Sequence, residues 1–198
     1  MSDRPAEPAT DRVGICHSDE SDPFWAVGSL FERLVAGEHT GGSLGAMIVT
    51  QRPGTATPMH VHTREAEAWF VLDGTVTYRA GTELTTLSSG DFIYLPKDVP
   101  HAFRVNGPRP VRYLALAFPG ALLDLYTEIG VPASERRLPD GGLAAADVEA
   151  WNMLAPSYGL RVVGPPIPDP AVGVSGTPDP AAPDLRERDR PEGRSTER

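Results

Sequence analysis

The sequence predicts an all-β fold, an antiparallel sandwich or jelly-roll barrel, followed by a short helical cap. At least seven short segments rich in β-branched and aromatic residues recur along the chain, and Gly, Pro, Asn or Asp bounds each of them. Their spacing of about 8 to 12 residues is typical of antiparallel folds. After the last of them the apolar residues change to a helical period.

The predicted strands are four to eight residues long and cover 43–50, 67–72, 75–80, 83–87, 91–95, 101–105 and 111–118. Asp73-Gly74 lies between the second and third of these strands and matches the sequence of a two-residue type I′ turn. We therefore expect those two strands to form a hairpin.

Two amphipathic segments follow the strands. Residues 122–129 place apolar side chains at i, i+3, i+4 and i+7 and end at Gly130. Residues 145–154 repeat this pattern before Pro156 stops it. We expect these segments to form the cap, within 119–160.

Composition indicates one folded domain between polar ends. From Pro165 onward the chain has eight prolines in 34 residues and too few apolar side chains to offset the entropy of ordering. We expect a flexible leader at 1–21, a folded domain at 22–166 and a disordered tail, rich in Pro, Arg and Glu, at 167–198.

Charge and hydropathy exclude several classes of partner. The chain has 27 acidic and 18 basic residues and a net charge of −9, so it lacks the basic surface that nucleic acids require. No apolar run approaches the roughly 20 residues of a membrane-spanning helix.

The polar N-terminus does not resemble a secretory signal, so we expect a cytoplasmic protein. The single cysteine, Cys16, excludes a disulfide framework.

Candidate metal ligands lie in two stretches. His60 and His62 are at i and i+2, so in a strand both point to the same face. Glu67 opens the next strand, and Pro100 restricts the backbone just before His101. Three imidazoles and one carboxylate suit one divalent transition metal, Fe, Mn, Ni, Co, Cu or Zn.

Other interpretations of these residues remain open. Glu65 could replace Glu67 as the carboxylate ligand, or the whole group could be polar residues at a barrel mouth without metal. His17 and His39 are expected to be solvated loop residues. Cys16 and His17 lie in a polar leader and offer too few ligands for a metal site.

Two aromatic residues are candidates for the wall of a substrate pocket. Trp69 is two residues from Glu67 and Phe103 is two residues from His101. In regular strands each shares the face of its neighbour.

The first stretch resembles a motif of the cupin superfamily, G-x5-H-x-H-x(3 or 4)-E-x6-G. It matches at every fixed position, with the four-residue option: Gly54, His60, His62, Glu67 and Gly74.

The second stretch resembles the other cupin motif, G-x5-P-x-G-x2-H-x3-N, through Gly90, Pro96 and His101. Asp98 stands where the family has Gly, and Asn106 comes one residue late. Aspartate tolerates the left-handed conformation better than most residues, so we expect the turn to persist. The position of Asn106 leaves its role open.

The resemblance implies a small jelly roll, usually a homodimer, in which His60, His62, Glu67 and His101 hold one divalent metal. Short segments after residue 118 look like bacterial single-domain cupins grouped with quercetin 2,3-dioxygenase. This implies a metal-dependent dioxygenase that opens a flavonol or related enol, with Glu67 accepting the hydroxyl proton and dioxygen as co-substrate. A redox-neutral isomerase, cyclase or decarboxylase, or a small-molecule-binding cupin without turnover, remain alternatives.

Overall fold

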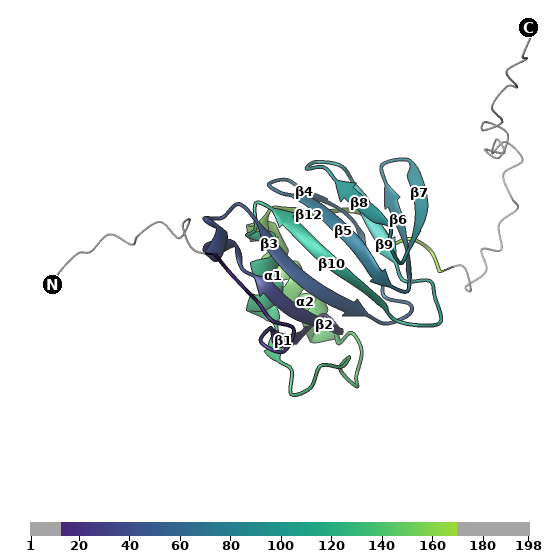
Figure 1. The fold of residues 1–198 in the computed structure, drawn as a ribbon. Coiled ribbons are helices and arrows are strands. Elements are labelled where there is room, and N and C mark those ends of the chain that lie inside the picture. Colours follow the sequence, from purple (N-terminus) through teal and green to yellow (C-terminus); the bar gives the residue numbers. More distant parts are fainter. Residues whose placement is uncertain (1–12, 170–198) are drawn as a thin grey trace, which may run out of the picture. The chain divides into compact units, whose positions relative to one another are not determined.

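The structure, a computed structural model, describes residues 13–169 (Figure 1). Much of the expected leader at 1–21 and most of the expected tail at 167–198 lie outside these residues. The three domain boundaries therefore stay predictions. Within the described residues, no helix is both long enough and apolar enough to cross a membrane.

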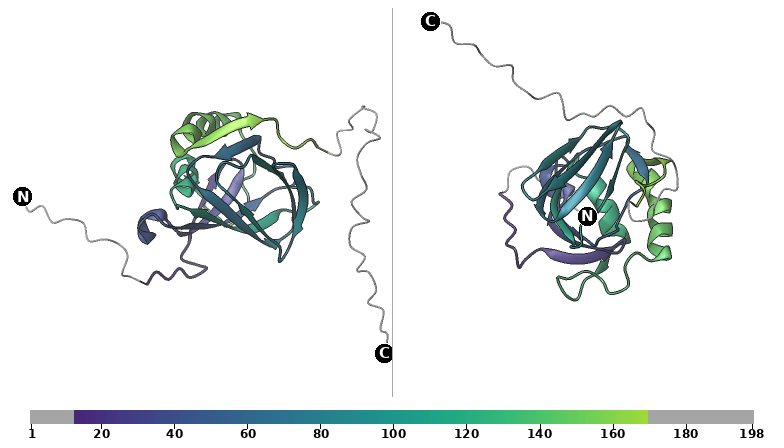
Figure 2. Two further views of the ribbon diagram at one scale, coloured as in Figure 1. Left: turned by 90° about the horizontal axis from the view of Figure 1, so that it is seen from above. Right: turned by 90° about the vertical axis from the view of Figure 1, so that its right-hand side faces the viewer.

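Two antiparallel sheets face each other and enclose the core, which confirms the jelly-roll prediction (Figure 2). One sheet has seven strands in the order β11-β1-β2-β3-β10-β5-β8, and the other has five in the order β12-β4-β9-β6-β7. The strands are β1 (Asp22–Ala26), β2 (Ser29–Val35), β3 (Gly45–Gln51), β4 (Met59–His62), β5 (Ala66–Asp73), β6 (Thr75–Ala80), β7 (Glu83–Ser88), β8 (Phe92–Leu95), β9 (His101–Arg104), β10 (Val111–Phe118), β11 (Val131–Pro132) and β12 (Leu160–Gly164).

Side-chain alternation explains why these strands form a two-layered core. In β10, Val111, Tyr113, Ala115 and Ala117 are buried, while Arg112 between the first two is exposed. Because successive side chains of a strand point to opposite faces, this pattern buries one face of the sheet and leaves the other outside.

The helical cap contains α1 (Leu122–Ile129) and α2 (Ala145–Leu154), as expected, and the short 3₁₀ helix η3 (Ala155–Tyr158). A further 3₁₀ helix, η2 (Gly37–Thr40), follows β2. Helix α1 buries three leucines, whereas α2 has no fully buried residue. Helix α2 therefore lies on the domain as a surface element.

The predicted Asp73-Gly74 hairpin is wrong. β5 and β6, which flank it, belong to different sheets, and Gly74 with φ 83° carries the chain from one sheet to the other. The two-residue hairpin joins β6 and β7 instead, with Gly81 at φ 58°. Both positions need a left-handed backbone, so glycine alone does not distinguish a hairpin from a crossover.

Four further strands were not predicted: β1, β2, β11 and β12. β4 was considered only through the i, i+2 spacing of His60 and His62. The four are short or carry proline or charged residues, which weakens the strand signal. β12 is important for the site because it pairs with β4, which carries two of the candidate ligands.

Candidate metal centre

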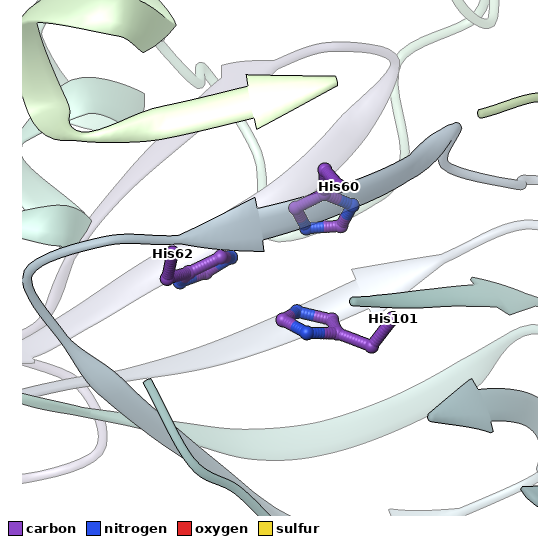
Figure 3. Close-up of side chains that lie close together, drawn as sticks. All are labelled: His60, His62 and His101. Atoms are coloured by element: carbon purple, nitrogen blue, oxygen red, sulfur yellow. The ribbon is translucent and has the colours of Figure 1, made fainter. Parts of the chain in front are cut away.

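The five-stranded sheet brings the three predicted histidines together (Figure 3). His60 and His62 lie on β4, and His101 on β9 pairs directly across from His60. One nitrogen from each ring lies within 4.8 Å of the other two, and all three residues are buried. The i, i+2 spacing and the strand pairing thus produce a compact cluster.

Backbone carbonyls fix two of the three rings. His60 Nδ1 lies 2.8 Å from the Pro58 carbonyl, and His101 Nδ1 lies 2.9 Å from the Val99 carbonyl. Because a carbonyl only accepts, Nδ1 must carry the proton in both rings. The Nε2 lone pair is then left for a metal, as in most histidine ligands.

The turn before His101 is also tied to the ligand strand. Asp98 has φ 66°, which confirms the prediction that aspartate keeps the left-handed turn of the motif. Its N–H donates to the His62 carbonyl at 2.8 Å. Asp98, which stands where the cupin motif has glycine, therefore connects the two segments that carry the candidate ligands.

Glu67 approaches the cluster from the opposite sheet, on β5. Its Oε2 lies 3.8 Å from His62 Nε2 and 3.7 Å from His101 Nε2. Its Oε1 accepts a hydrogen bond from the Trp69 indole N–H. Glu65 is buried as well, but its Oε2 has no hydrogen-bond partner. Of the two candidate acids, Glu67 is the one in contact with the imidazoles.

Burial controls the protonation of the cluster. It lowers the pKa of His60 from 6.5 to about 3, helped by the neighbouring His101 and His62. Burial also lowers the pKa of His62. For Glu67, burial alone would raise the pKa, but contacts with His101, His62 and the Trp69 indole lower it to about 2. At neutral pH these two imidazoles are neutral and the carboxylate is ionised.

The donor atoms fit a divalent transition metal. Both ring nitrogens of His62 and Nε2 of His101 are buried without a hydrogen-bond partner. Buried polar atoms are normally satisfied, and a metal ion bound by Nε2 of His62 and Nε2 of His101 would satisfy two of these three nitrogens. Imidazole nitrogens with one carboxylate suit a borderline divalent ion rather than Ca²⁺ or Mg²⁺.

A cavity of ≈ 150 Å³ adjoins the cluster through Glu67. One water needs roughly 10 to 15 Å³ on the same measure, so the cavity has room for a small organic molecule. Both predicted pocket residues, Trp69 and Phe103, line it. The other lining residues are mostly apolar or aromatic and include Val27, Phe31, Val49, Pro58, Tyr113, Leu123, Tyr126, Val148 and Trp151.

Some of these cavity residues were not predicted. Trp151 of α2 lies 6.5 Å from His60 between ring centres, and Tyr113 stacks on Trp69 at 3.5 Å. Gln51 lines the same cavity, and its Oε1 is buried without a partner. Helical spacing placed Trp151 on an apolar face, but only the tertiary structure places that face over the cavity.

The remaining polar candidates lie elsewhere. Cys16, His17 and His39 are exposed, as expected. Asn106 donates a hydrogen bond from its amide to the Thr77 hydroxyl, so it ties a loop to β6.

The fold and the two motifs agree with a comparison of families. Residues 47–117 match the family model of the cupin domain, so this region of the chain is a cupin domain.

Individual relatives are more distant. The chain is 32% identical over 115 residues to quercetin 2,3-dioxygenase of Bacillus subtilis (strain 168), which covers 56% of this chain and 34% of that protein. It is 29% identical over 66 residues to the xanthan biosynthesis protein XanB of Xanthomonas campestris pv. campestris (strain B100), covering 33% of this chain and 14% of the relative. The chain thus spans about a third or less of the length of these relatives. Among solved structures, KdgF from Halomonas sp. superposes with a TM-score of 0.48 and 22% identity, over 55% of this chain and 94% of that one.

Proposed function

We propose that the protein is a metal-dependent dioxygenase that oxidatively opens a flavonol or a related apolar enol. His60, His62, His101 and Glu67 would hold one divalent transition metal. The observation that carries the substrate class is the aromatic cavity that reaches Glu67.

The cavity lining distinguishes between substrate classes. It contains six aromatic side chains and one acid, Glu67, and none of its residues is Arg, Lys or His. Sugar phosphates and small carboxylic acids are normally held by Arg or Lys. A planar and largely uncharged substrate fits these walls better, which favours a flavonol-like enol over the acids and sugars of many redox-neutral cupins.

The chain's own residues have distinct roles in this reaction. The aromatic walls would bind the planar rings and exclude water. Glu67, ionised at neutral pH, would accept the proton of the enol hydroxyl. A bound divalent metal supplies Lewis-acid stabilisation of the resulting anionic oxygen. Dioxygen is the oxidant, so one dioxygen is consumed for each ring opened.

We also propose that the protein is a homodimer, joined through the outer face of the seven-stranded sheet. Figure 1 shows this face in front of both helices. Four aromatic side chains are 38 to 57% exposed on it: Phe70, Phe92, Tyr94 and Phe118. At roughly 200 Å² per ring they expose about 400 Å², half of the ~800 Å² that each partner of a standard interface buries.

A second copy of the chain is the occupant that fits this face. The strand pairs Phe70–Leu114 and Ala68–Leu116 make the patch continuous across neighbouring strands. No aromatic residue lies in 1–12 or 170–198, so the rest of the chain offers no aromatic cover. The patch is uncharged, so two chains of net charge −9 can meet there without placing like charges in contact.

Oxygen uptake tests the proposed reaction. The purified protein, analysed for metal and loaded with Fe, Mn, Ni, Co, Cu or Zn in turn, is mixed with flavonols in an oxygen electrode. We expect stoichiometric oxygen consumption with at least one metal, and no product under anaerobic conditions. Turnover that continues without oxygen would assign the protein to the redox-neutral class. Binding without turnover in either atmosphere would identify a binding module.

A further inference from the structure

The Glu67 carboxylate has two oxygens in different surroundings. Oε2 faces His62 and His101 at 3.8 and 3.7 Å, whereas Oε1 accepts the hydrogen bond of the Trp69 indole. Both residues lie on the inner face of β5, two positions apart. One oxygen is thus directed toward the imidazoles and the other is already bonded.

The Trp69 indole is held firmly in this position. It stacks on Tyr113 at 3.5 Å with an angle of 8° between the rings. Tyr78 meets it edge-on at 5.0 Å, and Phe103 lies at 5.0 Å. Trp69 is 4% exposed, so the indole cannot turn away without disturbing three packed rings.

We propose that Trp69 is a positioning residue that restricts Glu67 to one oxygen donor toward a bound metal. This inference rests on the proposed metal site. A carboxylate can bind a metal through one oxygen or through two. With Oε1 held by the indole, only Oε2 is available, and the position that Oε1 would have taken stays open for a substrate oxygen.

The alternative is that Trp69 only fills the core. The two roles differ in what happens when the indole N–H is removed and an aromatic ring is kept. If Trp69 positions Glu67, Trp69→Phe leaves Oε1 buried without a donor, and the metal is the nearest group able to satisfy it. If Trp69 only fills space, the coordination of the metal does not change.

The test uses cobalt(II) alone as a spectroscopic probe of coordination number. Cobalt(II) absorbs visible light less strongly as its coordination number rises. We expect the visible absorption of the cobalt-loaded protein to fall in Trp69→Phe. We also expect azide, a small anion that needs an open position, to bind roughly tenfold more weakly to that variant than to the wild type.

Trp25→Phe is the matched control. The Trp25 indole also donates a hydrogen bond, to the Arg137 carbonyl at 2.7 Å, but it lies on β1 outside the cluster. Trp25→Phe makes the same chemical change as Trp69→Phe. It should leave the visible spectrum of bound cobalt and the azide affinity at wild-type values.

The outcomes separate this inference from the proposed function. If cobalt binds both proteins and Trp69→Phe keeps the wild-type spectrum and azide affinity, the positioning role is wrong and the metal site stands. If cobalt does not bind the wild type, both proposals fail. Should Trp69→Phe not fold, wild-type protein labelled with ¹⁵N-tryptophan tests the hydrogen bond on which the inference rests. The Trp69 indole N–H should exchange slowly with zinc bound, and fast exchange would overturn the inference.

Discussion

The two sheets contribute different chemistry to the space between them. The five-stranded sheet supplies the three imidazoles, on β4 and β9. The seven-stranded sheet supplies Glu67 and Trp69 on β5 and Tyr113 on β10. One sheet thus carries the candidate nitrogen donors, and the other carries the candidate carboxylate and much of the aromatic wall.

In the proposed site this division places the three imidazole ligands on one sheet, and the carboxylate ligand that also acts as the base on the other. Substitutions on the five-stranded sheet should remove the metal. Substitutions on the facing sheet should leave metal in place and change the chemistry around it. Variants of the two sheets therefore test the division directly.

The largest effect is expected from His101→Ala. It removes one of three imidazoles and leaves a hole in a closely packed donor set, so we expect the purified protein to lose most of its metal. Elemental analysis measures this directly. His39→Ala, an exposed histidine, is the control and should keep wild-type stoichiometry. Retention of metal by His101→Ala together with its loss in the control would refute the ligand assignment.

Glu67→Gln should separate the effect of the seven-stranded sheet on turnover from the effect of the five-stranded sheet on metal content. Glutamine keeps the shape and an oxygen donor but loses the charge and the basicity, so some metal should remain on the imidazoles. The loss of a general base typically lowers a rate by about 10² to 10⁴, and we expect turnover of a flavonol to fall by that factor. Metal content and oxygen uptake are measured on the same sample. Wild-type turnover in this variant would remove Glu67 from the reaction.

The sequence predicts the ligand strand better than it predicts the environment of the ligands. Period-2 spacing places His60 and His62 on one face, and the same rule places Trp69 beside Glu67. Local rules contain no information on which strands pair, so the proximity of His101 to His60 followed only from the resemblance to the cupin motifs. The hydrogen bond from Trp69 to Glu67 depends on rotamers that the packing of the core selects.

The errors and omissions have the same origin. Asp73-Gly74 meets the local requirement of a hairpin, but whether the next strand pairs in the same sheet is a tertiary matter. Likewise, the position of Trp151 over the cavity depends on how α2 docks on the domain. Long-range packing, which no local pattern encodes, decided both features.

A fall in pH should destabilise the metal-free protein through one group on each sheet, His60 on β4 and Glu67 on β5. The pKa of His60 is about 3 when folded and 6.5 when unfolded, so the unfolded chain binds more protons between these values. The stabilisation is complete above pH 6.5 and is lost as the pH falls toward 3. Glu67, with a pKa lowered from 4.5 to about 2, acts in the same direction below pH 4.5.

At about pH 5, His60 alone should lower the free energy of unfolding by about 2 kcal/mol. Denaturant titration of the chelator-treated protein at neutral pH and at about pH 5 measures this change. His60→Gln cannot be protonated, so it should show a weaker dependence on pH. A metal-free wild type that becomes more stable on acidification would contradict the assignment.

The smallest effect on metal content is expected from substitutions on the outer face of the seven-stranded sheet. The same strands form the inner and the outer face of this sheet. Phe70 lies between Trp69 and Val71 on β5 but points outward, and on the neighbouring strand Tyr94 is 56% exposed. Tyr94→Glu places a charge in the proposed dimer interface without touching the cavity. We expect the variant to sediment as a monomer and the wild type as a dimer in analytical ultracentrifugation, with metal content unchanged.

Leu84→Glu is the control. Leu84 is equally exposed, at 57%, but it lies on β7 of the other sheet, so the variant should stay dimeric. A wild type that is monomeric, or a Tyr94→Glu variant that stays dimeric, would show that the outer face has no role in association.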